Sequence, residues 1–334
     1  MPQMNALFYR ATGPARQVLT YGPQPQPAPA PGEVLVRVAV SGANPSDAKA
    51  RSGLRGGPAF DLVIPHSDGA GRIAAVGDGV DPARVGQRVW LWNAAFGRAQ
   101  GTAAEFVALP QDQAVPLPDA ASYAAGACMG IPALTAHRCL FADGPVAGQD
   151  ILVTGGAGAV GAYAVQMAKL GGARRVIATT SGGAKSEHAL AMGADAVVNY
   201  RTGDTAKAIL DATDGRGVDR IVEVEFGGNL SVTRAVLKPN GVIAAYGSMA
   251  DPEPALPFYP MMFSAQTLRM VLVYLLPSAA RAQGIADLTA WLAANALHHP
   301  VSVLAPFSEG WRAHEACESS ARIGAALIEV SSDV

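Results

Sequence analysis

The stretch 150–170 constrains the fold more than any other part of the sequence. Residues 151–154 are a short apolar, β-branched run typical of a buried strand, and from residue 159 onward the apolar positions follow helical spacing. The glycines between them fit G-x-G-x-x-G, a pattern in which glycine permits a tight turn, close approach of a phosphate and close helix–strand packing. The helix start then offers N–H groups and partial positive charge to an anion. The residues expected at this site are Gly156, Gly158, Ala159, Val160 and Gly161. A glycine-rich loop is also often only a loop, so the motif alone leaves both interpretations open.

Length and charge restrict the classes of protein that remain. A chain of 334 residues is long enough for two domains and a large core. The 25 basic and 27 acidic side chains give a formal charge of −2, which argues against nucleic acid or an anionic membrane as the main partner and favours a small ligand. The three cysteines are few and unpatterned, which predicts neither a disulfide framework nor a zinc cluster and favours a cytoplasmic location. We expect neither a signal peptide nor a membrane span.

The first 120 residues or so are expected to form mostly β structure. Alternating or β-branched runs predict antiparallel strands, and the proline-rich segment 22–32 is expected to be an extended spacer. The predicted strands are 5–9, 33–40, 71–76 and 88–92.

From about residue 122 the pattern changes to alanine-rich helix, and after the glycine turn strands and helices alternate. Strands separated by helices of this length imply a parallel sheet with right-handed crossovers. The predicted strands are 151–154, 175–180, 196–200, 220–225, 241–247 and, as the sixth, 268–276. The predicted helices lie around 187–192 and 205–212, and a further one ends near 237.

The last part of the chain has no place in that parallel sheet. A helix through residue 291, an extended piece at 299–304, a helix around 311–319 and a strand at 325–330 are expected there. We therefore expect the tail to return to the first, antiparallel module.

The residues after the second strand of the parallel sheet bear on the choice of dinucleotide. A site that prefers NAD usually places an acidic residue there, whereas this chain has hydroxyls, two glycines and a lysine. Thr180, Ser181 and Lys185 suit the 2′-phosphate of NADP, with Tyr200 after the next strand flanking the same phosphate. Lys185 as an ordinary solvated lysine and Tyr200 as a cap on the sheet edge are the alternatives.

These motifs together carry a family likeness over nearly the full length. The chain resembles the zinc-independent quinone oxidoreductases of the medium-chain dehydrogenase/reductase superfamily, the group that includes zeta-crystallin. The likeness rests on the segments 42–47, 51–53, 65–71, 76–77, 86–89, 101–106, 130–136, the glycine turn, 193–195, 199–201 and 241–248.

The resemblance implies an α/β fold in two parts. A GroES-like, β-rich catalytic domain would take residues 1–124 and the return at 277–334, and a Rossmann domain with a doubly wound, parallel, six-stranded sheet would bind NADPH with residues 125–276. The active site would lie in the cleft. Dimers in the superfamily commonly pair their sixth strands, so a homodimer through 268–275 is expected, unless a helix or loop covers that edge.

The same comparison predicts a site without metal. Zinc alcohol dehydrogenases of the superfamily use cysteine and histidine ligands, and here the matching positions hold Asn44 and Ser67. The loop 93–102 also contains no cysteine for a structural zinc. His66, one residue away, remains as an alternative ligand, although adjacent residues seldom converge on one ion.

Without a metal, the charge that develops on the substrate oxygen must be met by protein donors. Candidates cluster in 44–55, where Asn44 and Lys49 are the expected catalytic residues. Related quinone reductases often carry tyrosines where this chain has Lys49 and Arg55. Lys49 in an ion pair with Asp47 or Asp68, and an Asn–Pro turn at residue 44, are the alternatives.

Other residues are expected to line the substrate or the cofactor. Trp92, Asn93 and Phe96 are predicted to wall the substrate cleft, although Trp90 and Trp92 alternate along one strand and one of them belongs to the core. Gly247 and Ser248 follow the fifth strand, where open parallel sheets bind ligands.

Two further positions are less settled by the sequence. If the resemblance holds, Thr135 lies near the nicotinamide; otherwise it is a helix-interior threonine. Glu223 and Glu225 are expected to point to the same side of their strand and have no assigned role.

The resulting hypothesis is an NADPH-dependent, zinc-independent reductase that transfers hydride to a quinone or another α,β-unsaturated carbonyl, of the NADPH:quinone oxidoreductase or enone reductase type. The alternative is a crystallin-like protein that binds NADPH for structure or regulation, with little turnover. A zinc alcohol dehydrogenase is the third interpretation. Fold alone does not choose the acceptor.

Overall fold

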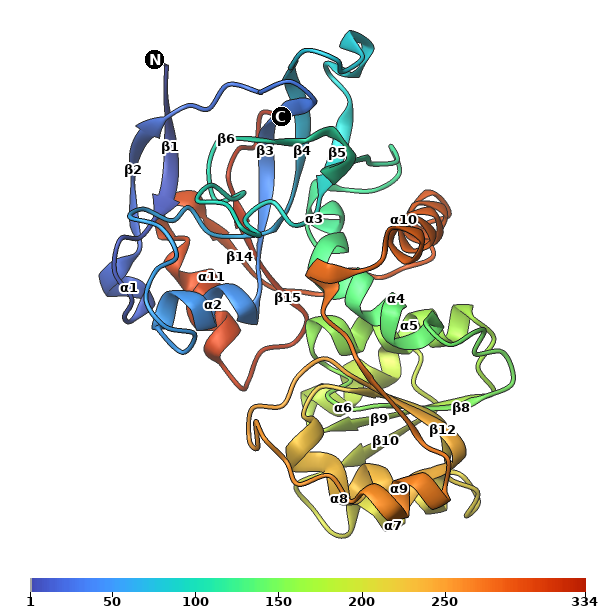
Figure 1. Cartoon of the computed structure of the whole chain (residues 1–334). Coiled ribbons are helices and arrows are strands. Elements are labelled where there is room, and N and C mark those ends of the chain that lie inside the picture. Colours follow the sequence, from blue (N-terminus) through green and yellow to red (C-terminus); the bar gives the residue numbers. More distant parts are fainter. Residues whose placement is uncertain (1) are drawn as a thin grey trace. The chain divides into compact units, whose positions relative to one another are not determined.

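The computed structural model describes residues 2–334, which divide into two compact units (Figure 1). Unit 1 comprises the chain up to Ile131 together with Ile285–Val334, and unit 2 comprises Pro132–Gly284. Both changes of unit fall inside helical segments, the π-helix Met129–Ala133 and helix α10 (Ser278–Ala293).

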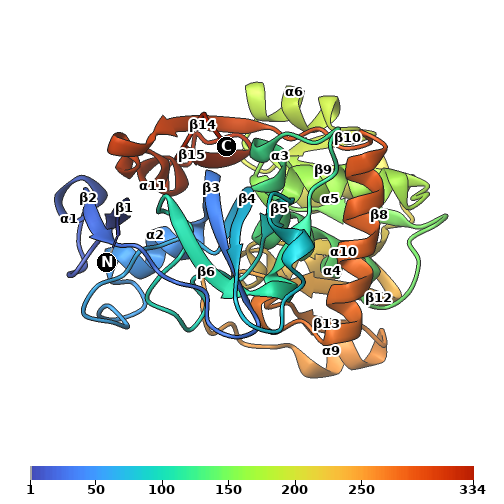
Figure 2. The ribbon, with the colours of Figure 1, turned by 90° about the horizontal axis from the view of Figure 1, so that it is seen from above.

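Unit 1 is built on a seven-stranded sheet in the order β14-β15-β3-β4-β5-β7, with β6 also paired to β3. Figure 2 shows β15, β3, β4 and β5 side by side. Valines that alternate along β3 pack with residues of β6 in a buried cluster, as the alternating pattern predicts. The strands are β3 (Glu33–Ala43), β4 (Asp68–Val76), β5 (Arg88–Leu91), β6 (Phe106–Pro110), β7 (Ala114–Pro116), β14 (Val301–Pro306) and β15 (Ala325–Glu329).

The tail returns to this sheet, as expected. β15 pairs antiparallel with β3, from Ala326 opposite Ala43 to Glu329 opposite Val40, and β14 runs parallel to β15. The helices of unit 1 are α1 (Ala15–Val18), α2 (Pro45–Ser52), α3 (Tyr123–Gly126) and α11 (Trp311–Glu318).

Unit 2 holds a parallel six-stranded sheet in the order β10-β9-β8-β11-β12-β13. The chain starts in the middle and winds outward to both sides, which confirms the predicted doubly wound Rossmann sheet. Figure 1 shows α4, α5 and α6 on one face of this sheet and α7, α8 and α9 on the other.

The bounds in unit 2 follow the predicted order of strands and helices. The strands are β8 (Asp150–Val153), β9 (Arg175–Thr180), β10 (Ala196–Asn199), β11 (Val218–Glu223), β12 (Leu237–Ala245) and β13 (Thr267–Met270). The helices are α4 (Leu134–Phe141), α5 (Ala159–Leu170), α6 (Ala184–Ala191), α7 (Thr205–Ala212), α8 (Phe226–Val236) and α9 (Phe258–Phe263). Local chemistry sets some of these bounds; α7 begins where the Asp204 carboxylate accepts from the Lys207 N–H at 3.0 Å.

Three expectations need correction. The sixth strand was predicted too long: pairing ends at Ala245 opposite Met270, because β12 ends there, and a 3₁₀ turn follows at Val273–Leu275. The spacer at 22–32 is not entirely a spacer, because its first residues belong to β2 (Thr20–Pro25), which pairs with β1 (Gln3–Phe8); prolines are tolerated on such an edge.

The third correction concerns helix α2, which the sequence interpretation missed. Asn44 stands at its N-cap, Pro45 at its first position and Asp47 at N3, which together are a recognisable start signal. Within residues 2–334, no helix combines the length and apolar character required to cross a membrane.

Candidate functional site

The glycine turn of unit 2 joins the end of β8 to the start of α5. Gly155 has a left-handed φ of 65°, and its carbonyl accepts from the Gly158 N–H at 2.9 Å. A Cβ on Gly161 would lie 2.3 Å from the Gly155 oxygen, so only glycine allows the helix to approach the turn this closely. A Cβ on Gly158 would meet nothing nearer than 3.4 Å. The bare backbone at Gly158 therefore leaves room for a ligand beside the start of α5, where Ala159 and Val160 follow.

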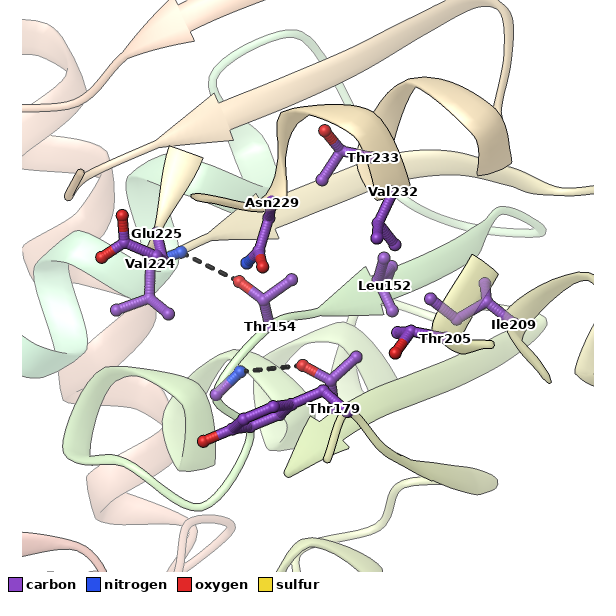
Figure 3. Close-up of a pocket in the computed structure, with 12 residues that line it drawn as sticks. Leu152, Thr154, Thr179, Thr205, Ile209, Val224, Glu225, Asn229, Val232 and Thr233 are labelled. Atoms are coloured by element: carbon purple, nitrogen blue, oxygen red, sulfur yellow. Dashed lines mark hydrogen bonds between the residues drawn. The ribbon is translucent and has the colours of Figure 1, made fainter. Parts of the chain in front are cut away.

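A cavity of about 230 Å³ opens beside this turn (Figure 3). It adjoins the ends of β8, β9 and β11, at the point where the winding direction of the sheet reverses. Figure 3 shows the two bonds that hold its rim: Val224 N–H to Thr154 Oγ1 at 2.9 Å and Gly155 N–H to Thr179 Oγ1 at 3.3 Å. Apolar walls with a few polar groups suit a flat ring. The cavity is lined by Leu152, Thr154, Gly155, Thr179, Tyr200, Thr205, Ile209, Val224, Glu225, Asn229, Val232 and Thr233.

A buried carboxylate organises the floor of this region. Glu223 Oε1 accepts from Thr154 Oγ1 at 2.8 Å, from the Glu225 N–H at 2.6 Å and from Asn229 Nδ2 at 2.9 Å. Burial raises the pKa of Glu223 above its usual value, although these three donors oppose the shift. Glu223 therefore ties the ends of two neighbouring strands to helix α8.

Glu225 makes different contacts from Glu223. The expectation that both glutamates point to the same side of their strand is therefore wrong. Strand β11 ends at Glu223, so the alternation of faces stops before Glu225. The Glu225 carboxylate accepts instead from the Met249 N–H at 2.8 Å and the Ala250 N–H at 2.9 Å. It fastens the loop that follows β12.

The segment after β9 brings together most of the residues predicted to meet a 2′-phosphate. The Thr180 and Ser186 hydroxyls lie 2.8 Å apart, and the Gly182 N–H donates to Thr180 Oγ1 at 3.2 Å. Tyr200 is half-exposed, donates its N–H to the Thr180 carbonyl at 3.0 Å and lines the cavity. Ser181 and the half-buried Lys185 lie in the same segment, which contains no acidic residue between 179 and 186.

Gly247 and Ser248 lie at the end of β12, beside a second, more open cavity of about 480 Å³. Ser248 Oγ accepts from the Gly227 N–H at 2.9 Å and donates to the Asp251 carbonyl. A Cβ on Gly247 would lie 2.4 Å from the Val224 oxygen, so this turn too depends on glycine. Thr135 belongs to the same unit, where it is buried on α4.

In unit 1, Asn44 is held by a buried carboxylate. Asn44 Nδ2 donates to Asp68 Oδ2 at 2.8 Å, and the Ile131 N–H donates to both Asp68 oxygens at 2.9 Å. A Cβ on Gly130 would lie 2.1 Å from Asp68 Oδ1, so the π-helix closes on this carboxylate only because residue 130 is glycine. The second Asn44 amide hydrogen makes only a long contact of 3.4 Å with the Gly42 carbonyl. That hydrogen is therefore held less tightly than the one that Asn44 donates to Asp68.

Asp47 occupies the first turn of α2. Its Oδ2 accepts from the Asn44 N–H at 2.8 Å. Burial raises the pKa of Asp47 to about 7, while hydrogen bonds from the Asn44 and His66 backbone and the charge of Arg55 act in the opposite direction. Lys49 is half-buried on the same helix and Arg55 is exposed beyond it.

The three residues predicted to wall the substrate are divided between core and surface. Trp92 is buried, and its Nε1 donates to the Asp112 carbonyl at 3.2 Å. Asn93 is buried with a left-handed φ of 53°, and its carbonyl accepts from Arg98 at 3.2 Å. Phe96 is exposed, whereas Trp90 is the core tryptophan of this strand.

The predicted residues thus form two groups. The turn glycines, Thr135, the hydroxyls after β9, Lys185, Tyr200, Gly247 and Ser248 belong to unit 2, and Asn44, Lys49, Trp92, Asn93 and Phe96 belong to unit 1. The sequence interpretation missed Asp68 as the partner of Asn44, missed Ser186 and Asn229, and left Glu223 without a role. Of these residues, only Glu223 is noticeable from the sequence, because it is an acidic residue at the end of an otherwise apolar strand.

Two family models match the chain. The alcohol dehydrogenase GroES-like domain matches residues 30–119, and the zinc-binding dehydrogenase domain matches residues 159–291. Together with the sheet order, these matches define a medium-chain dehydrogenase/reductase.

The relatives narrow this class. The chloroplastic quinone-oxidoreductase homolog of Spinacia oleracea is 30% identical over 260 residues, 75% of each chain, and the quinone oxidoreductase of Rattus norvegicus is 33% identical over 216 residues. The chain belongs to the quinone oxidoreductase family. The match covers 64% of the length of the rat protein.

Solved structures share the fold along almost the whole chain. Mycobacterial Rv1454c complexed with NADPH has a TM-score of 0.85 at 28% identity, with 98% of this chain and 99% of that chain covered. An NAD-dependent alcohol dehydrogenase has a TM-score of 0.88 at 27% identity, with 98% of this chain and 100% of that chain covered.

Proposed function

We propose that the protein is an NADPH-dependent, zinc-independent oxidoreductase that transfers hydride to a quinone or another α,β-unsaturated carbonyl. Membership of the quinone oxidoreductase family supports the reaction class. The observation that carries the proposal is the site of unit 2: a glycine turn with no close neighbour at the Cβ position of Gly158, beside a largely apolar cavity at the switch point of the sheet.

The cofactor choice rests on the segment after β9, since the fold is shared by proteins described with NADPH and with NAD. The hydroxyl pair Thr180–Ser186, the Lys185 ammonium and the Tyr200 ring suit a 2′-phosphate, which an acidic residue here would repel. In this arrangement the cavity would hold the adenine ring, and the start of α5 would hold the pyrophosphate.

Zinc independence rests on the residues of unit 1. Asn44 and Ser67 stand where the resemblance places zinc ligands, and Asn44 Nδ2 is bonded to Asp68. His66, the alternative ligand, has both ring nitrogens in hydrogen bonds, to Ser41 and His314. Metal analysis tests this point: stoichiometric zinc, or loss of activity with a chelator, would contradict it.

The chemistry assigned to unit 1 is stabilisation of the acceptor. NADPH would supply the hydride when bound, and the loosely held amide hydrogen of Asn44 would support the negative charge that develops on the acceptor oxygen. Lys49 supplies positive charge, and Trp92, Asn93 and Phe96 contact the acceptor ring.

The decisive experiment measures NADPH oxidation with 1,2-naphthoquinone, 9,10-phenanthrenequinone and simple enones. We expect turnover with at least one of them. Tight NADPH binding without turnover would favour the structural or regulatory alternative and overturn the proposed reaction.

We also propose a homodimer through the edge formed by residues 268–275. Among residues 2–334, β13 is the terminal strand of its sheet and pairs with β12 alone. Exposed apolar side chains are frequent in the segment 249–275, which contains β13: Met249, Leu256, Phe258, Tyr259, Met262, Phe263, Met270, Leu272 and Leu275. Light scattering should give twice the monomer mass, and Met270→Pro should give a monomer; a monomeric wild type would refute the dimer.

We place the protein in the cytoplasm, in keeping with its three free cysteines.

A further inference from the structure

Four buried polar side chains of unit 1 form a row of hydrogen bonds that ends at the Asp68 carbonyl. His66 Nδ1 lies 2.8 Å from Ser41 Oγ, and Ser41 Oγ lies 2.7 Å from Thr102 Oγ1. On its other side, His66 Nε2 lies 2.9 Å from His314 Nε2. All four side chains are fully enclosed, and four separate parts of the sequence supply them: β3, the turn before β4, the loop between β5 and β6, and α11.

The directions of these bonds follow from one end of the row. Thr102 Oγ1 donates to the Asp68 carbonyl, which can only accept. Ser41 must then donate to Thr102, and His66 must donate from Nδ1 to Ser41. The Nε2 of a neutral His66 is left as an acceptor, so His314 donates from its own Nε2. The structure thereby assigns one tautomer to each histidine.

Both histidine rings, at the end of the hydrogen-bonded row away from Thr102, are neutral because they are buried. Burial lowers the pKa of His66 to about 3. Burial lowers the pKa of His314 as well, and the charge of Arg51 adds to that effect. Arg51 is itself buried and held by Glu318 and the Gly13 carbonyl. Two protonated imidazoles would place two donors in the shared Nε2–Nε2 contact, so the geometry excludes a charge on both rings at once.

The other end of the row, at Thr102, contacts Asp68, whose carboxylate accepts from Asn44. The Thr102 hydroxyl donates to the Asp68 carbonyl, and the Thr102 N–H donates to the His66 carbonyl at 2.9 Å. His66 itself has a left-handed φ of 80°, which is uncommon for a residue with a side chain and persists where surrounding contacts determine it. The Asp68 carboxylate then fixes the Asn44 amide.

We propose that His66 and His314 are positioning residues for Asn44: their hydrogen-bonded pair holds the backbone of 66–68 in its left-handed turn and so aims the Asp68 carboxylate at the Asn44 amide. This inference rests on the proposed function for its kinetic consequence. It also assigns a role in the site to helix α11, which lies 248 residues from His66 along the chain.

The kinetic test is a double-mutant cycle between His314→Phe and Asn44→Ala, with steady-state kinetics for a quinone that the wild type reduces. His314→Phe removes the donor to His66 while keeping a ring, and we expect kcat to fall roughly tenfold to a hundredfold, with the NADPH dissociation constant unchanged within about twofold. In the Asn44→Ala background the same substitution should have little further effect. Equal losses in both backgrounds would overturn the proposal.

A second variant and a control variant distinguish the loss of these hydrogen bonds from a general folding defect. Ser41→Ala breaks the row at its middle with little change in volume, and we expect the same dependence on Asn44. His299→Phe alters a half-buried histidine of the same unit outside the network, and should leave kcat unchanged. If His299→Phe lowers kcat as much as His314→Phe, the effect belongs to general packing and the proposal fails.

A spectroscopic test is independent of turnover. Long-range ¹H–¹⁵N spectra should show His66 protonated at Nδ1 and His314 at Nε2, and the Asn44 side-chain amide signal should move in His314→Phe. Opposite tautomers, or an unmoved Asn44 signal, would overturn the inference even if the wild type is inactive. A wild type that shows these signals without reducing any acceptor would refute the proposed function alone.

Discussion

The two units each contain a fully buried carboxylate whose pKa burial raises, Glu223 in unit 2 and Asp68 in unit 1. Glu223, the last residue of β11, receives its hydrogen bonds from Thr154 after β8, from the Glu225 N–H and from Asn229 on helix α8. Asp68 receives its bonds from a helix cap, Asn44, and from a π-helix, through Ile131. Glu223 stabilises a site whose shape is set by the backbone of the glycine turn. Asp68 instead sets the orientation of one side chain, that of Asn44. The two should therefore respond differently to substitution.

The largest effect is expected at the glycine turn, where unit 2 depends on backbone alone. Gly158→Ala adds a Cβ that makes only an ordinary van der Waals contact, so the melting temperature should stay near that of wild type while NADPH affinity falls about a hundredfold, because the pyrophosphate loses its close approach. Gly161→Ala pushes a Cβ to 2.3 Å from a backbone oxygen and should also lower the melting temperature. Fluorescence titration and thermal unfolding separate the two. Unchanged NADPH affinity in Gly158→Ala would show that the phosphate lies elsewhere.

Substituting each carboxylate by its amide tests the comparison directly. Asp68→Asn presents an N–H group to the donors of Asn44 and Ile131, and should cost about 1–3 kcal/mol of stability and lower kcat roughly tenfold. Glu223→Gln should cost a similar amount of stability and change kcat less than about twofold. Urea unfolding and quinone kinetics on both variants measure this. A larger fall in kcat for Glu223→Gln than for Asp68→Asn would reverse the assignment of roles.

The rim of the unit 2 site should give a smaller and more selective effect. Lys185→Ala should raise the KM for NADPH about tenfold and leave the KM for NADH nearly unchanged, since only NADPH carries the 2′-phosphate. Lys207→Ala is the matched control, because this exposed lysine of the same unit pairs with Asp211 four residues on. Equal effects of Lys185→Ala on both cofactors would make it an ordinary surface lysine.

The same contrast explains what the sequence could predict. Unit 2 repeats one pattern, an apolar strand followed by a helix, so its sheet order, its glycine turn and the hydroxyls after β9 follow from local sequence. The length of β13 did not follow, because it depends on where β12 ends. The Asn44–Asp68 bond joins residues 24 apart and the His66–His314 contact joins residues 248 apart. No local periodicity encodes such pairs, because each partner acquires its role only when the sheet brings the segments together. The helix cap at Asn44 was within reach of sequence rules, since Asn, Pro and a carboxylate at N3 stand in order.

The smallest expected effect concerns the pH dependence of stability in unit 1. The pKa of Asp47 is raised from 3.8 to about 7 in the folded protein, so between these values the unfolded chain loses a proton that the folded protein keeps. Deprotonation then favours the unfolded chain, and the contribution of Asp47 to stability, full below about pH 4, is lost as pH rises towards 7. Asp47→Asn should flatten the fall of the urea midpoint over this interval, while Asp119→Asn, on the exposed surface, should leave the curve unchanged. If the curve of Asp47→Asn matches that of wild type, Asp47 is not the proton-binding group, and the pH response of unit 1 must be sought at Asp68, whose variant Asp68→Asn would then flatten it instead.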